Sequence, residues 1–126
     1  MIKITVPIYY EVEYKTKPNK TILVGLNWYR NVHFHLNNKV KHFYHNLIIA
    51  ELGKLKIETP CRPHFNVFLK RKGTDGHNVR SIIEKYVLDG LVECGAIPDD
   101  TPEYIQSGSW ECSYDKENPR CEITFK

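Results

Sequence analysis

The sequence predicts an α+β fold in which two helices cover a mixed or antiparallel sheet. Three observations predict it: an alternating apolar pattern near the N-terminus, two segments with apolar residues at helical spacing, and a second pair of strand-like segments near the C-terminus. The expected order is strand, strand, helix, strand, helix, strand, strand, which is typical of α+β folds. At 126 residues, 41% hydrophobic and 26% charged, the chain suits one core, so we expect a single domain over residues 1–126.

The N-terminal segment predicts a β-hairpin. Residues Ile2 to Tyr14 alternate and are rich in Ile, Val and Tyr, which favours one long strand. Thr21 to Val24 suits its partner, because the intervening Lys17-Pro18-Asn19-Lys20 is typical of a turn.

Two helices and a strand follow. Apolar residues three and four positions apart from Leu36 to Leu52 line one helical face, and Gly53 ends that helix. Residues 60–72 alternate through Phe65, Val67 and Leu69 and predict a strand. The second helix is expected from Asn78 to Glu93, with Gly95 as its stop.

The C-terminal segment predicts two further strands, Tyr104 to Tyr114 and Arg120 to Lys126, joined by a turn at residues 115–119. Cys112 and Cys121 would then face each other across the last hairpin. We expect reduced thiols at all four cysteines, because no secretory signal peptide is evident.

Composition restricts the function only loosely. A net charge of +3 and a pI near 8.6 permit a polyanionic partner without requiring one. No apolar stretch approaches the roughly 20 residues of a membrane helix, so we expect a cytoplasmic protein without a membrane partner.

Charged residues gather at both ends of the second helix. The stretch TDGHN places Asp75, His77 and Asn78 after the basic run Lys70-Arg71-Lys72, and Asp99-Asp100 follows the helix. The acids at the two ends can meet only if the intervening loop folds back or if two chains share the site. Such a cluster of carboxylates would need a cation, and oxygen ligands suit Mg²⁺.

If the acids do meet, nearby side chains can bind nucleic acid. Lys70, Arg71, Lys72 and Arg80 would hold the phosphates of a DNA backbone beside the metal. A simpler interpretation is structural: Asp75 is a helix cap, and Asp99-Asp100 belongs to an exposed turn. Only the combination of these motifs favours a metal and DNA site over a purely structural role.

That combination resembles a known family. The segment from Thr74 to Ile105 is similar to the core of the RusA-like Holliday junction resolvases, small endonucleases common in phages and prophages. The matching positions are Asp75, His77, Asn78, Lys85, Asp89-Gly90-Leu91, Gly95 and Asp99-Asp100. Leu26 to Asn31, LNWYRN, loosely resembles the segment that precedes the first helix in the family.

The resemblance implies a RusA-like fold and an intertwined homodimer that acts in the cytoplasm of a bacterial host. It implies binding of branched, four-way DNA junctions and paired, symmetric, Mg²⁺-dependent nicks. Asp75 and Asp100 would be catalytic metal ligands, with Asp99 an accessory acid at the metal and Lys85 a catalytic cation near the scissile phosphate. Asn78 would lie among the DNA-binding residues.

His77 departs from the family pattern, which usually has a second carboxylate there. Three interpretations remain: an altered metal ligand that favours Mn²⁺, a base or phosphate contact, or a helix-start residue in a protein that binds junctions without cutting them. The alternative function is therefore a non-catalytic junction-binding protein, or a phage protein that engages a regulatory partner.

Overall fold

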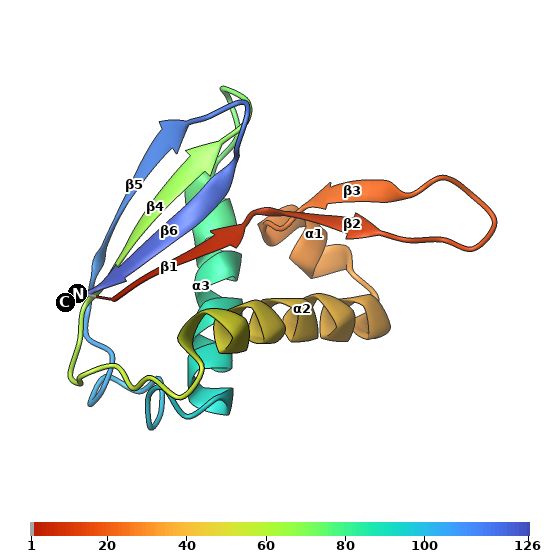
Figure 1. Cartoon of the computed structure of the whole chain (residues 1–126). Coiled ribbons are helices and arrows are strands. Elements are labelled where there is room, and N and C mark those ends of the chain that lie inside the picture. Colours follow the sequence, from red (N-terminus) through yellow and green to blue (C-terminus); the bar gives the residue numbers. More distant parts are fainter. Residues whose placement is uncertain (1) are drawn as a thin grey trace.

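A computed structural model describes residues 2–126 and shows an α+β fold (Figure 1). The elements in chain order are β1 (Ile2–Pro7), β2 (Tyr9–Val12), β3 (Lys20–Leu23), α1 (Leu26–Asn31), α2 (Phe34–Leu52), β4 (Pro63–Leu69), α3 (Gly76–Glu93), β5 (Ser109–Tyr114) and β6 (Arg120–Phe125). The predicted class is confirmed, although the structure has three helices where two were expected. Among the residues described, no helix is long and apolar enough to span a membrane.

The main sheet is mixed. Its strand order is β1-β6-β4-β5, and only β5 runs parallel to its neighbour β4. The sheet packs its apolar face on α2 and α3, and β4 shows this alternation clearly because Phe65, Val67 and Leu69 are buried while Asn66 and Phe68 are on the other face. The prediction for this strand is confirmed.

The expectation of one long N-terminal strand is wrong. The chain leaves the main sheet after Pro7, and Ile8, which is fully buried, separates β1 from β2. Pro7 has no N–H to continue a ladder, and its carbonyl accepts a hydrogen bond of 2.7 Å from the Tyr44 hydroxyl. Alternation alone does not reveal that the two halves belong to different sheets.

The predicted hairpin is present as a separate ribbon. Strands β2 and β3 pair antiparallel and extend away from the main sheet as an arm (Figure 1). The arm meets α2 through an edge-to-face contact between Tyr10 and Phe43, whose ring centroids are 5.2 Å apart. A two-stranded ribbon is only marginally stable alone, so this contact with α2 helps to hold it.

Helices α2 and α3 pack closely against each other. Gly53 ends α2 at φ +59°, as predicted, and donates its N–H to the Ile49 carbonyl. Between the helices the rings of Tyr44 and Tyr86 stack at 5.4 Å. Gly90 lets the helix axes approach, because a Cβ there would lie 2.7 Å from Ile48 Cδ1.

The expected pairing of the two C-terminal strands is wrong. Strand β4 lies between β5 and β6, and Val67 is in register with Cys112 on one side and with Cys121 on the other. The two cysteines are therefore two strand spacings apart, roughly 10 Å. As a result β5 lies at the edge of the sheet, where one of its sides has no strand partner within residues 2–126.

Candidate metal and DNA-binding residues at the ends of α3

Asp75 caps the N-terminus of α3. Its Oδ1 accepts hydrogen bonds from the backbone N–H groups of His77 (3.0 Å) and Asn78 (3.3 Å), and its own backbone is extended. The structural interpretation of this residue is thus confirmed. The capping bonds leave the second carboxylate oxygen of Asp75 available to a ligand, because both bonds use Oδ1 and the side chain is exposed.

His77 contacts a cation and an aromatic ring. Its Nδ1 lies 3.0 Å from Arg80 Nη2, and its ring centroid is 5.7 Å from that of Trp110. Arginine can only donate, so Nδ1 accepts, and a neutral His77 ring then carries its proton on Nε2. Neither nitrogen offers a free lone pair in this arrangement. Of the three interpretations of His77, the geometry is therefore least favourable to a metal ligand.

Arg80 organises the first turns of α3. In addition to His77, it forms an ion pair with Glu84 one turn further along, and its Cζ lies 5.6 Å from the Trp110 ring centroid. Its side chain is only 17% exposed. The guanidinium is therefore fixed in place before any ligand binds, although its charge is partly neutralised by Glu84.

The remaining predicted DNA contacts lie near this end of the helix. Lys70, Arg71 and Lys72 are exposed in the loop between β4 and α3, where phosphates can reach them.

Lys85, the predicted catalytic cation, is also exposed. At 1.5 Å per residue it lies about 14 Å along α3 from Gly76. Within one chain Lys85 is thus not beside Asp75.

Trp110 was missed by the sequence analysis. It is 42% exposed and lies on edge strand β5, on the side that faces α3. The sequence pattern that could have identified it is the alternation of Trp110, Cys112 and Tyr114, all three of which are exposed in the structure. We expected β5 to pair with β6, and that expectation concealed an aromatic surface at the sheet edge.

The second group of acids lies at the other end of α3. Asp99 and Asp100 are exposed, and they line a hollow of about 200 Å³ together with Lys41, Asp89 and Glu93. Among the residues of this hollow, Asp89 is the nearest to Asp75 along α3, and about 20 Å of helix separates the two. The loop does not fold back, so the acids that the sequence analysis considered together do not meet within one chain.

A divalent cation does not fit the side chains of a single chain as they stand. Within residues 2–126, no group of three or more His, Cys, Asp or Glu side chains is arranged to hold a metal ion. The hollow beside Asp99 and Asp100 has the oxygen ligands that Mg²⁺ prefers, but it also contains the competing ammonium of Lys41. The other arrangement considered from the sequence, a site shared between two chains, is taken up in the proposed function.

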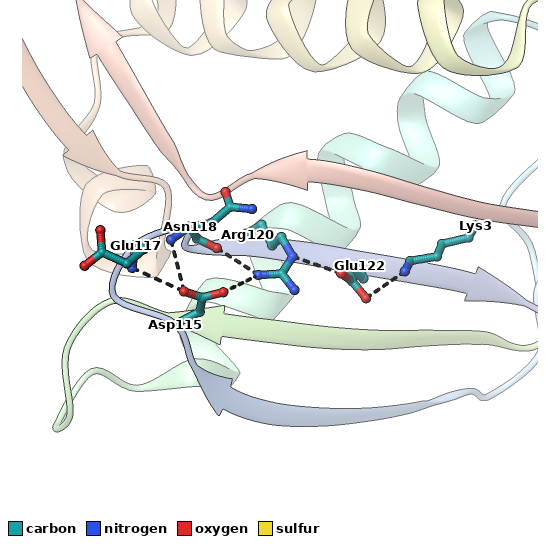
Figure 2. A network of polar contacts seen from close by, with 6 residues as sticks. All are labelled: Lys3, Asp115, Glu117, Asn118, Arg120 and Glu122. Carbon is teal, nitrogen blue, oxygen red and sulfur yellow. Dashed lines mark hydrogen bonds and ion pairs between the residues drawn. The ribbon is translucent and has the colours of Figure 1, made fainter.

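The opposite face of the sheet is polar and internally paired. Figure 2 shows Arg120 between Asp115 (2.8 Å) and Glu122 (2.9 Å), with Lys3 completing the row at 3.0 Å from Glu122. The hydrogen bond from Arg120 lowers the pKa of Asp115, and those from Lys3 and Arg120 lower the pKa of Glu122. These charges neutralise one another, so the candidate site lies elsewhere.

A row of side-chain hydrogen bonds also connects edge strand β5 to β4 on this face. His64 Nδ1 lies 2.6 Å from Ser109 Oγ, and its Nε2 lies 3.0 Å from Glu111 Oε2. The Glu111 side chain is 57% exposed. We interpret this group as a surface connection between neighbouring strands.

Comparison with known proteins gives no independent guide to the site: no protein-family model matches the chain, and no curated protein matches it.

Proposed function

We propose that this protein is a metal-dependent endonuclease that acts on branched DNA, including four-way junctions, as a two-fold dimer. The observation that carries the proposal is the grouping at the N-terminal end of α3. There an exposed carboxylate, Asp75, lies near the basic loop at residues 70–72, a fixed guanidinium and an exposed tryptophan. Cations supply the affinity for phosphates, and an aromatic ring suits the unpaired bases of a branch point.

The proposal includes a dimer because the acids at the two ends of α3 are far apart within one chain. If two copies pack about a two-fold axis with their α3 helices antiparallel, Asp75 of one copy can approach Asp99 and Asp100 of the other. Each dimer then holds two equivalent sites, which matches the symmetry of a four-way junction. In such a shared site Asp75, Asp99 and Asp100 would hold Mg²⁺ or Mn²⁺, and the chemistry that the ion would supply is activation of water for phosphodiester hydrolysis.

The arm supports association with a second copy. A groove of about 560 Å³ lies between the arm and α2, lined by side chains that include Tyr9, Tyr10, Leu36 and Phe43. A second hollow, of about 310 Å³, is lined by Tyr14, Trp28 and other residues of the arm, α1 and α2. Both hollows also have charged or polar residues in their lining, among them Glu11 and Lys20. Exposed apolar side chains rimmed by polar ones are typical of surfaces that a partner covers.

A non-catalytic junction-binding protein is the second candidate. It is favoured by the hydrogen bonds of Asp75 and His77, since both side chains already stabilise the start of α3 without a metal. In this case the basic loop and Trp110 would bind the branch point, and a regulatory protein would be the further partner.

The test is cleavage of a synthetic four-way DNA junction against a linear duplex of matched sequence, in Mg²⁺ and separately in Mn²⁺. Asp75→Asn and Asp100→Asn should each abolish the nicks while junction affinity persists. Glu58→Gln, a change at an exposed acid outside α3, is the matched control and should cut normally.

The outcomes separate the two candidates. Paired nicks that require both aspartates support the nuclease. Tight junction binding without cutting in either metal would identify the protein as the non-catalytic binder. Equal affinity for junction and linear duplex would contradict both.

A further inference from the structure

A small hollow opens beside α3 on the side of edge strand β5. Its volume is about 270 Å³. The residues that line it are Pro63, Phe65, Arg80, Glu84, Ser107, Gly108, Ser109 and Trp110. Typical small-molecule sites measure roughly 300–1,000 Å³, so this hollow suits one small planar group.

Trp110 gives the hollow an aromatic wall. The ring is 42% exposed, and Arg80 and His77 hold it in place from the α3 side, at 5.6 Å and 5.7 Å from its centroid. An exposed indole fixed by its neighbours offers a stacking surface that needs little reordering when a ligand binds.

Polar groups on α3 give the hollow a hydrogen-bonding wall. Arg80 donates to Glu84 Oε2, which leaves Glu84 Oε1 as an acceptor, and the Glu84 side chain is 31% exposed. Arg80 Nε is buried and has no acceptor among the residues described. Because Arg80 Nε is buried, Glu84 Oε1 is the group of this pair that remains for a ligand in the hollow.

The backbone at the start of β5 closes the hollow. Arg62 Nη1 donates to the Ser107 carbonyl at 3.1 Å, and Gly108 lies so close to Pro63 that a Cβ would be 1.7 Å from the Pro63 carbonyl oxygen. Only glycine fits this approach, so the segment is held firmly against β4.

We propose that this hollow binds one unpaired nucleobase of branched DNA. The base stacks on Trp110, and the acceptor on Glu84 receives an exocyclic amino or ring N–H group from the base edge. The inference rests on the proposed function and deepens it: Arg80 lies about one helical turn from the Asp75 cap, so an extruded base here would place its flanking phosphates toward the basic loop and Asp75.

The test uses the 126-residue chain with Trp28→Phe, which leaves Trp110 as the one tryptophan, since the sequence has two. Its emission is followed while the chain binds a duplex with a single bulged base, and then a fully paired duplex of equal length. The bulged position carries 2-aminopurine in a parallel titration, so stacking is detected from both partners.

Three substitutions complete the design. Trp110→Ala should weaken binding of the bulged duplex about 5- to 150-fold, the range expected for loss of one base–aromatic stack. Trp110→Phe should recover most of that affinity. Tyr114→Ala, a change at a 54% exposed aromatic on the same side of β5 but outside the hollow, should leave affinity within about twofold, because it removes no stacking wall.

Several results would overturn the inference. One is an equal loss of affinity for bulged and paired duplex in Trp110→Ala, and another is no loss at all. A change in oligomeric state in that variant would show that a second copy covers Trp110. If the unmodified chain binds a four-way junction while Trp110→Ala binds it equally well, only this inference fails; if the unmodified chain binds no DNA, the proposed function fails with it.

Discussion

Asp75 has a structural role that can be separated from a catalytic one by the choice of substitution. Asparagine caps helices about as well as aspartate, so Asp75→Asn should keep the bonds to the backbone N–H groups of His77 and Asn78. We expect its free energy of unfolding to stay within about 0.5 kcal/mol of that of the unmodified protein, while Asp75→Ala loses about 1 kcal/mol. Urea unfolding measures both.

Cleavage assays on the same variants complete this comparison. If Asp75 binds the metal, both variants lose cleavage although only Asp75→Ala loses stability. Normal cleavage by Asp75→Asn would show that Asp75 serves only as the cap of α3.

His45 makes stability depend on pH. The side chain is buried, and burial, followed by repulsion from Lys41 and to a smaller degree from His42, lowers its pKa below the ordinary value of 6.5; Glu93 and Asp89 oppose this shift. The unfolded chain therefore binds a proton at a pH where folded His45 does not. The stability that neutral, buried His45 contributes is therefore fully present above pH 6.5. It is lost as the pH falls from there toward the pKa of His45 in the folded protein.

We expect the urea midpoint of unfolding to decrease when the pH is lowered from 7.5 to 5.5. The midpoint of His45→Leu should decrease less over the same interval. The other five histidines remain in both proteins, so the difference between the two slopes isolates His45. Parallel slopes would show that His45 does not titrate in this window.

At the scale of elements, Gly90 sets how closely α2 and α3 approach. Alanine in place of a helical glycine normally adds up to about 1 kcal/mol of stability. Here the new Cβ would lie 2.7 Å from Ile48 Cδ1 and 3.2 Å from His45 Cδ2, so overpacking, which costs about 1–3 kcal/mol, should dominate. We predict that Gly90→Ala lowers the free energy of unfolding.

Ile48→Val removes the methyl group that the new Cβ meets. The double variant should thus be more stable than the sum of the two single changes predicts, with a coupling of about 0.5–3 kcal/mol. Additive effects would mean that the clash is relieved by other side chains.

Strand β5 shows the limit of reading elements one at a time. Its extent from Ser109 to Tyr114 lies within the predicted strand, because alternation and aromatic residues such as Trp110 and Tyr114 are local signals. Its partner was predicted wrongly, because pairing depends on contacts between residues distant in the sequence. Placing β4 between β5 and β6 exposes Trp110, and with it the surface on which our further inference rests.

At the scale of the whole molecule, the proposed dimer makes a sharp prediction for mixed subunits. If each site combines Asp75 of one chain with Asp100 of another, a dimer of Asp75→Asn with Asp100→Asn has one doubly altered site and one intact site. Random mixing gives mixed dimers half of the time, so single-strand nicking should return to about a quarter of the unmodified level.

Each variant alone, treated identically for subunit exchange, is the control and should remain inactive. No recovery on mixing would place all the ligands of a site in one chain and contradict the shared site. A monomer by light scattering at the assay concentration would do the same.

The sequence by itself determined the α+β class, the hairpin, the end of α2 at Gly53 and the strand that leads into α3. These features follow from local patterns, since side-chain periodicity and glycine or proline positions act within a few residues. It also placed Asp75 shortly before a helix, and Asp99 and Asp100 after it.

Only the tertiary structure decided whether these acids meet. A rigid helix of 18 residues keeps its two ends apart, and no local pattern states where a loop beyond it returns. The same holds for His77, whose ring lies 5.7 Å from that of Trp110 on β5, and for Trp110, whose exposure depends on the order of strands in the sheet. Each outcome is fixed by long-range packing, which the sequence encodes only through the whole fold.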